Sequence, residues 1–209
     1  MTTNLVHIID YGMGNIWSII GAIEHLGYEA ELVSSPEKIL ESKLLILPGV
    51  GSFRKAMESL KKDSLDKAIK DAVLSGNAKL LGICLGMQLL CRKSSEDGDT
   101  EGLGLMPYDV DLFTSREDHH LKVPHVGFNE VNFSDSSRIF AGIKKNSTFY
   151  FVHSYKIEPQ PLSSALESSC LYGKEFVAAF EKDNIFGTQF HPEKSQTSGL
   201  RLLENFLSL

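Results

Sequence analysis

The sequence predicts an α/β fold, a single domain with a central, mostly parallel sheet, helices on both faces and an antiparallel extension. In the first 95 residues, short apolar runs alternate with segments of helical periodicity, as in parallel strands joined by covering helices. Beyond residue 105 the strands become shorter and more closely spaced, which favours antiparallel pairing. No repeat or low-complexity linker interrupts residues 1–209, and 42% of the residues are hydrophobic, enough for one substantial core.

Apolar runs of four or five residues mark the strands of the first half, and apolar residues at helical spacing mark its helices. Ser35-Pro36 is typical of a helix start, and Asp63 is the expected cap of a later helix. We expect ligands outside the carboxyl ends of the strands. The expected elements are strand 5–9, helix 16–27, strand 29–33, a helix from Ser35-Pro36, strand 44–47, a helix across 60–73, strand 79–83 and a helical run from Met87.

The second half contains β-rich segments that end in one amphipathic helix. Its expected elements are strands 108–113, 130–133, 148–152, 168–172, 176–180 and 184–190, followed by helix 199–209.

Composition excludes several classes of function. The net charge of −6 and the lack of basic runs argue against a nucleic-acid surface. We expect no membrane association and a cytoplasmic location, because no signal peptide or long apolar span is evident. Three cysteines cannot all pair, and none forms a CxxC motif. Cys91 and Cys170 are interpreted as core residues.

Cys84 is the candidate nucleophile. It occupies the middle of Gly82-Ile83-Cys84-Leu85-Gly86, between a buried strand and a helical run. This pattern is typical of a sharp strand-to-helix turn that exposes the nucleophile, and the glycines permit the tight turn. The N-terminus of the following helix favours a negatively charged thiolate.

His191 is the candidate base, and Glu193 is the residue that orients it. Both belong to Gln189-Phe190-His191-Pro192-Glu193, at the end of an expected strand. In an extended strand, residues two apart share a face, so the Glu193 carboxylate is expected beside the His191 ring. A parallel sheet would bring this segment to Cys84.

Acyl transfer also requires hydrogen-bond donors for the developing oxyanion. The Leu85 amide at the start of the helix is one candidate. Gly49-Val50-Gly51, after the third strand, could supply another, although a plain turn is the alternative interpretation.

With these pieces assembled, the chain resembles the class I (triad) glutamine amidotransferases nearly end to end, most closely the glutaminase subunits of imidazole glycerol phosphate synthases. The Gly-x-Cys-x-Gly turn and His-Pro-Glu mark the class. The segments that mark the subfamily are 10–15 (DYGMGN), 47–51 (LPGVG), 124–129 (PHVGFN) and 150–155 (YFVHSY). The resemblance implies a flavodoxin-like type 1 glutamine amidotransferase domain across residues 1–209.

The resemblance implies that Cys84 attacks the carboxamide of glutamine and that His191 transfers the proton to ammonia. A glutamyl thioester is then hydrolysed, without any cofactor. It further implies that the amino-acid end of glutamine is held by Gln88, Glu96 and the backbone at Ser154 and Tyr155. The peptide at Gly49-Val50 would have to reorient for activity, which would make activity depend on a partner.

The implied partner is a (β/α)₈ barrel cyclase, bound as a heterodimer, that receives ammonia and makes imidazole glycerol phosphate and aminoimidazole carboxamide ribonucleotide. The resemblance places Asn15, Phe128, Tyr150 and Lys194 near that interface. Their alternative interpretations are a turn cap, a core aromatic, a buried tyrosine and a solvated lysine. Phe128, where the family usually has tryptophan, and Trp17 depart from the pattern. They leave open a paralogue that supplies a related barrel synthase in sugar amidination.

Other functions are disfavoured. Gly12-Met13-Gly14 lacks the third glycine of a dinucleotide loop. His119-His120 and His125 lack spaced acidic or cysteine partners, so we expect a solvated loop rather than a metal site. A cysteine hydrolase of another kind on the same fold would lack the subfamily motifs. An inactive regulatory subunit would lack part of the triad.

Overall fold

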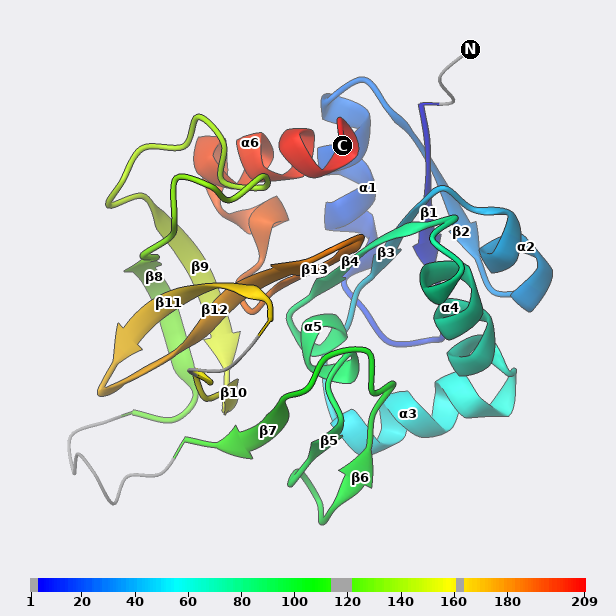
Figure 1. The fold of residues 1–209 in the computed structure, drawn as a ribbon, viewed down its shortest axis with the longest axis horizontal. Helices are drawn as coiled ribbons and strands as arrows, with labels where there is room; N and C mark the ends of the chain where they lie inside the picture. The colour runs from blue at the N-terminus through cyan, green and yellow to red at the C-terminus, as the bar shows by residue number, and fades with distance from the viewer. Residues whose placement is uncertain (1–3, 114–121, 161–163) are drawn as a thin grey trace.

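The computed structural model describes residues 4–113, 122–160 and 164–209, and most of its strands join one large sheet (Figure 1). The helices are α1 (Ile16–His25), α2 (Pro36–Glu41), α3 (Phe53–Lys62), α4 (Leu65–Leu74), α5 (Leu85–Leu89), the 3₁₀ helix η1 (Pro192–Lys194) and α6 (Gln196–Leu207). The strands are β1 (Leu5–Ile9), β2 (Glu29–Val33), β3 (Leu44–Leu47), β4 (Lys79–Ile83), β5 (Lys93–Ser94), β6 (Thr100–Glu101), β7 (Asp109–Leu112), β8 (His125–Glu130), β9 (Thr148–His153), β10 (Tyr155–Ile157), β11 (Leu166–Tyr172), β12 (Lys174–Lys182) and β13 (Ile185–Thr188).

The large sheet has seven strands in the order β11-β12-β13-β4-β3-β1-β2. The five strands from β2 to β13 run parallel, and β12 and β11 continue the sheet with antiparallel pairing. The predicted α/β class, with a parallel centre and an antiparallel extension, is confirmed. Because Thr188 pairs with Ile83, the carboxyl ends of β13 and β4 lie side by side.

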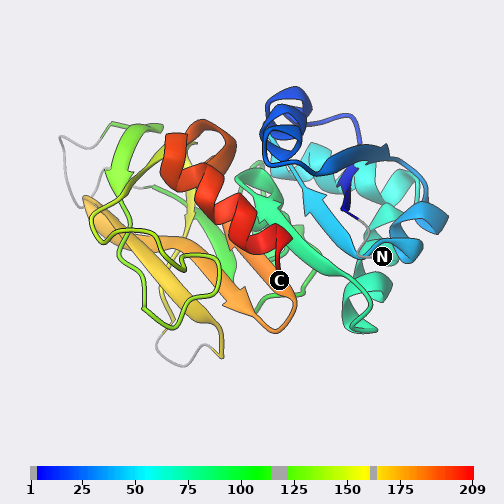
Figure 2. The same cartoon turned by 90° about the horizontal axis from the view of Figure 1, so that it is seen from above.

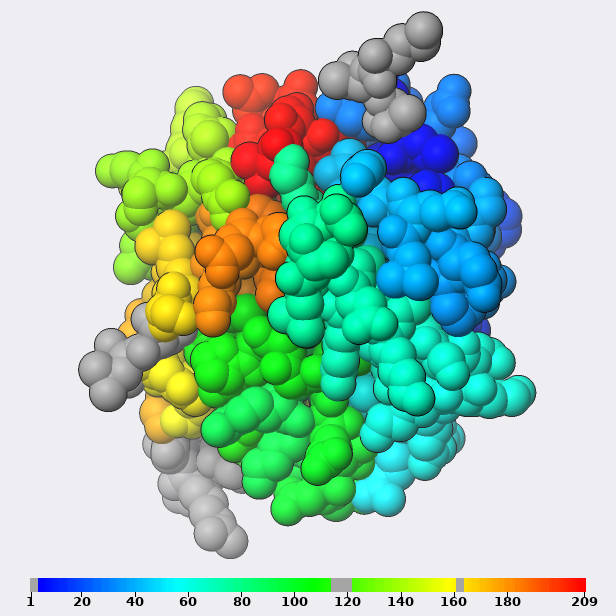
Figure 3. All heavy atoms as spheres, turned by 45° about the vertical axis from the view of Figure 1, so that its right-hand side comes forward, coloured from blue at the N-terminus to red at the C-terminus, as the bar shows by residue number. Residues whose placement is uncertain are grey.

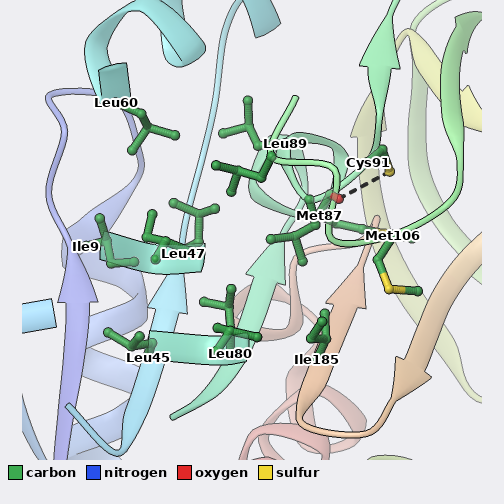
Figure 4. Packing of buried hydrophobic residues seen from close by; sticks show 14 of the residues in the cluster. Ile9, Leu45, Leu47, Leu60, Leu80, Met87, Leu89, Cys91, Met106 and Ile185 are labelled. Atoms are coloured by element: carbon green, nitrogen blue, oxygen red, sulfur yellow. Dashed lines mark hydrogen bonds between the residues drawn. The ribbon is translucent and has the colours of Figure 1, made fainter. Parts of the chain in front are cut away.

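Helices cover both faces of this sheet, and neighbouring residues of one strand therefore enter different cores. Ile8 packs into a cluster with α1 and α6, whereas Ile9 packs against α2, α3 and α4. Figure 2 shows α6, in red, lying across its face of the sheet. Figure 4 shows the other face, where Leu47 and Leu80 lie among Met87 and Leu89 of α5. Full burial on both faces explains the continuous apolar runs in the strands.

Two smaller sheets flank the large one. β10, β7, β5 and β6 form one sheet, and β8 and β9 form an antiparallel pair. In Figure 3 the green surface of the β5–β6 region adjoins the cyan surface of α3, with which β6 is in contact. β5, β6 and β10 were not predicted from the sequence, because strands of two or three residues carry too little pattern.

Two expected elements are wrong. The helix across 60–73 is interrupted: α3 ends at Lys62, Asp63 is its C-cap, and Ser64, in the left-handed conformation, precedes α4. The stripe of apolar residues continues through the break and concealed it. The strand expected at 130–133 is instead β8, ending at Glu130, because β8 takes up the pairing with β9. Beyond it, Asn132 makes only an isolated bridge to Ser169.

Cys91 and Cys170 are buried, which confirms the interpretation of both as core residues. Figure 4 shows Cys91 beside Met87, with its thiol directed to the Met87 carbonyl oxygen at 3.7 Å. None of the helices in the described part of the chain is long and apolar enough to cross a lipid bilayer.

Candidate active site

A cavity of about 230 Å³ lies at the carboxyl ends of β4 and β13. Its volume, below the range for drug-sized ligands, suits a small molecule of amino-acid size. Cys84 follows β4 directly, and its amide donates a 2.7 Å hydrogen bond to the Thr188 carbonyl of β13. Parallel pairing therefore brings the two distant segments to one place. The lining residues are Val50, Gly51, Cys84, Leu85, Gln88, Val152, His153, Ser154, Tyr155 and His191.

The turn at Cys84 requires glycines on both sides. Cys84 has φ 55° and ψ −112°, a conformation that side chains rarely adopt and that stores backbone strain. A Cβ on Gly82 would lie 2.7 Å from the Gly86 carbonyl oxygen, and one on Gly86 would overlap the Leu47 carbonyl. The expected exposure of the nucleophile is wrong for the residue as a whole, because Cys84 is only 6% exposed. It is accessible through the cavity wall alone.

His191 and Glu193 form a buried pair. The Nδ1 atom of His191 lies 2.8 Å from Oε1 of Glu193, and both side chains are almost completely buried. The carboxylate accepts, so Nδ1 carries the proton and Nε2 is available to the sulfur. The contact arises from η1 rather than from the extended backbone that we expected, because Pro192 begins a 3₁₀ turn. The His191 amide also donates to the Tyr150 carbonyl at 2.9 Å.

The charges around His191 favour its protonated form. Burial lowers the pKa of His191, but the neighbouring Cys84 and Glu193 outweigh burial and raise the pKa to about 10. Among the described residues, Nε2 has no hydrogen-bond partner of ordinary geometry, although Cys84 acts on the ring. The arrangement therefore places an imidazolium and a cysteine sulfur at one cavity wall.

Most residues expected to bind substrate lie around this cavity. Val50, Gly51, Leu85, Gln88, Ser154 and Tyr155 line it. Gly49 lies behind the lining, where a Cβ would come within 2.9 Å of the Gly86 amide nitrogen and 2.7 Å of the Tyr11 hydroxyl. Gly51 has φ 101°, a conformation that favours glycine. The loop 49–51 thus packs directly on the turn that carries Cys84.

Glu96 is not brought into the lining of the cavity. Its carboxylate accepts a 2.8 Å hydrogen bond from the Phe53 amide at the start of α3. Burial raises the pKa of Glu96, opposed by the Phe53 amide and assisted by the charge of Asp97. In this structure Glu96 supports a helix end beside the site.

Three of the four residues expected at a partner interface are neighbours. The ring of Phe128, 45% exposed, lies 5.4 Å from that of Tyr150, and Lys194 Nζ lies 5.9 Å from the Tyr150 ring centre. Asn15 stands at the N-cap position of α1, where its side chain makes no capping hydrogen bond. Exposed apolar side chains accompany this group: Trp17 of α1 is 78% exposed and Val126 of β8 is 56% exposed.

A buried histidine pair was not predicted from the sequence. His125 was expected in a solvated loop, but it is fully buried on β8, between the rings of Phe151 and Tyr172. Its Nδ1 lies 2.9 Å from Nε2 of His153, and burial lowers the pKa of His125 to about 4. Aromatic residues far away in the sequence form this environment, so no local sequence pattern indicates that His125 is buried.

Two of the histidines considered as metal ligands, His119 and His120, lie outside the described residues. Within the described ranges, no group of three or more His, Cys, Asp or Glu side chains could hold a metal ion.

A model of the family "Glutamine amidotransferase class-I" matches residues 7–209. Among curated proteins, the "Imidazole glycerol phosphate synthase subunit HisH 1" of Parasynechococcus marenigrum (strain WH8102) is 45% identical over 203 residues, 97% of each chain. The corresponding HisH subunit of Acinetobacter baylyi (strain ATCC 33305 / BD413 / ADP1) is 41% identical over 97% of each chain.

Solved structures share the fold at lower sequence identity. A glutamine amidotransferase crystal structure superposes with a TM-score of 0.75 at 18% identity and covers 97% of each chain. The structure of PurLQS from Thermotoga maritima gives a TM-score of 0.70 at 17% identity, with 98% of this chain and 97% of that chain covered.

Proposed function

This chain belongs to the class-I glutamine amidotransferase family, and we propose that it hydrolyses glutamine as the glutaminase subunit of an imidazole glycerol phosphate synthase in histidine biosynthesis. The observation that carries the proposal is the meeting of Cys84 with the His191–Glu193 pair at one small cavity. The identity to HisH subunits over nearly the whole chain supports the subfamily.

In the proposed reaction the Cys84 sulfur attacks the carboxamide carbon of glutamine, and the carbonyl oxygen becomes an oxyanion. Backbone amides at Leu85 and in the loop 49–51 are the proposed donors to it. The His191 imidazolium gives its Nε2 proton to the departing nitrogen, so that ammonia leaves and a glutamyl thioester remains. Neutral His191 then takes a proton from water as the water attacks the thioester. Glutamate leaves, and the sulfur is free again.

Glu193 has an electrostatic and orienting role in this cycle. Its carboxylate accepts a hydrogen bond from Nδ1, with 2.8 Å between the nitrogen and oxygen atoms, which directs Nε2 toward the sulfur and stabilises the imidazolium. Gln88, Ser154 and Tyr155 are the proposed contacts for the amino-acid end of glutamine, because they line the same cavity. For Glu96, the proposed contact would require a movement away from the Phe53 amide.

The ammonia must reach an acceptor before it takes up a proton, because ammonium is not a nucleophile. We propose that a (β/α)₈ barrel cyclase binds over the surface formed by Asn15, Phe128, Tyr150 and Lys194. Exposed apolar side chains beside charged ones are typical of an interface. Trp17, two residues after Asn15 and 78% exposed, is a further apolar side chain available to the cyclase.

The test is glutamate release from the purified chain with and without the barrel cyclase. Cys84→Ala should bind the cyclase and remove glutamine-dependent synthesis, while free ammonia in equilibrium with an added ammonium salt still supports the cyclase. Cys91→Ala is the matched control, because that buried thiol packs in the core away from the cavity. Ordinary turnover in Cys84→Ala would refute the proposed nucleophile.

A paralogue that supplies a barrel synthase in sugar amidination is the second candidate, and Phe128 and Trp17 are the observations behind it. Synthesis of imidazole glycerol phosphate with the histidine-pathway cyclase decides between the two. A chain that hydrolyses glutamine only with another barrel synthase would favour the paralogue.

A further inference from the structure

Gln189 is a buried polar residue for which the proposed mechanism has no role. It follows β13, two residues before His191, and it is 0% exposed. Its backbone N–H donates a 2.8 Å hydrogen bond to the Ala178 carbonyl, which fixes the backbone at this position. A buried side-chain amide is costly unless its donors and acceptor are satisfied, so its partners indicate what it does.

The neighbours of Gln189 determine which end of its amide faces the sulfur. The Tyr155 carbonyl can only accept, so the group of Gln88 that lies 3.1 Å from it is the NH₂ group. The same Nε2 lies 2.9 Å from the Gln189 side chain, which must therefore present its oxygen there. The Gln189 NH₂ group is left facing the Cys84 sulfur, at 3.8 Å.

A second contact of the sulfur explains why such a donor matters. Sγ of Cys84 lies 4.0 Å from the Val152 carbonyl oxygen, which accepts from a thiol and repels a thiolate. The Gln189 N–H acts in the opposite direction, because it stabilises negative charge on the sulfur. In a buried site this stabilisation is stronger than in water.

We propose that Gln189 is a positioning residue that donates its side-chain N–H to the Cys84 sulfur and so stabilises negative charge on it at the cavity wall. The proposal rests on the proposed function of Cys84 as the nucleophile. Gln88 acts in it only by fixing the orientation of the Gln189 amide.

The test is the pH dependence of Cys84 alkylation by iodoacetamide, measured by mass spectrometry of the Cys84 peptide in the full chain. Gln189→Met has a similar shape but no donor. We expect its alkylation midpoint to rise by about one to two pH units, and its rate at pH 7 to fall about tenfold or more. Folding of each variant is checked by circular dichroism. A folded Gln189→Met with the wild-type midpoint would overturn the proposal.

Thr188→Val is the matched control. Within the described ranges the buried Thr188 hydroxyl has no hydrogen-bond partner, so this neighbouring change disturbs the strand without removing a hydrogen bond. Its midpoint should equal that of the wild type. An equal shift in Thr188→Val and Gln189→Met would show that packing alone moves the midpoint, and would contradict the proposal.

A measurement on the unmutated protein covers the case in which Gln189→Met does not fold. In ¹⁵N-labelled protein, the Gln189 side-chain resonance should shift with the same midpoint as alkylation, and Cys84→Ala should remove the shift. A resonance that stays constant while Cys84 titrates would refute the hydrogen bond. A failure of the proposed function gives a different result from a failure of the hydrogen bond. If Cys84 were not the nucleophile, wild-type chain alkylated at Cys84 would still hydrolyse glutamine with its partner.

Discussion

Acidification should destabilise the fold through the buried histidine pair. The Tyr155 carbonyl can only accept, so His153 donates to it from Nδ1 at 2.7 Å. His125 Nδ1 then donates to His153 Nε2 at 2.9 Å, and the Asn129 amide donates to His125 Nε2 at 2.6 Å. Every ring nitrogen has a partner while both rings are neutral. With the Asn129 amide in this orientation, protonation of either ring would place a donor against a donor.

The size of the effect follows from the pKa values. Burial lowers the pKa of His125 from 6.5 to about 4. Burial also lowers that of His153 to about 3, opposed by its hydrogen bond to Tyr155 and assisted by the charges of His125 and His191. Between pH 6.5 and 4 the unfolded chain binds two protons that the folded chain does not. Stability is therefore lost as pH falls, at roughly 1.4 kcal/mol per pH unit for each histidine.

At pH 5 the two histidines should lower the free energy of unfolding by on the order of 4 kcal/mol relative to its value above pH 6.5. That is a large part of the roughly 5–15 kcal/mol by which a domain is stable. His191 does not offset this loss. Its pKa is raised to about 10, so its contribution is complete below pH 6.5 and disappears as pH rises toward 10. The decrease in the free energy of unfolding as pH falls below 6.5 should therefore come from His125 and His153.

The assay is urea unfolding, followed by far-ultraviolet circular dichroism, at pH 7.5, 6.5 and 5.0. His125→Gln should show about half the wild-type loss between pH 6.5 and 5. His25→Gln, at an exposed position of α1, should retain the wild-type slope. Equal slopes in wild type and His125→Gln, or constant wild-type stability down to pH 5, would refute the reasoning.

Two further predictions concern residues of the proposed catalytic triad. Cys84→Gly should be about 1 kcal/mol more stable than Cys84→Ala, because glycine adopts φ 55° without backbone strain. Part of that gain is lost because glycine also raises the conformational entropy of the unfolded chain. A urea midpoint no higher than that of Cys84→Ala would contradict this prediction. Glu193→Gln should lower glutamine turnover with the partner about 10²-fold, because the His191 imidazolium loses its counter-charge. The partner's use of free ammonia from an added ammonium salt should be unchanged. Steady-state kinetics measure both activities, and a near wild-type rate would exclude that role.

The sequence predicted features that depend on neighbouring residues. The glycines on both sides of Cys84 predicted the turn, because a Cβ at Gly82 or Gly86 would clash with backbone atoms. The continuous apolar runs of β1, β3 and β4 predicted parallel strands, because a strand covered on both faces of the sheet is apolar at every position. The spacing of His191 and Glu193 indicated their contact, although a 3₁₀ turn rather than a strand brings them together.

The remaining features depend on contacts between distant segments, which no local pattern records. Gln189 meets Gln88 across 101 residues, and His125 meets His153 across 28. An isolated glutamine or histidine in the sequence looks like a surface residue. The break at Ser64 escaped detection for the opposite reason, since the apolar stripe continues on both sides of it.

The register of β13 connects the core to the site. Phe186 and Phe190 point into the core formed with α6, and Ile185 points into the opposite core. Because side chains alternate along a strand, a slip of one residue against β4 would move these aromatic rings to the wrong face. The same slip would replace Gln189 beside the Cys84 sulfur with Phe190 or Thr188, depending on its direction, and would displace His191. Hydrophobic packing on both faces of the sheet therefore stabilises the one register in which sulfur, amide and imidazole meet.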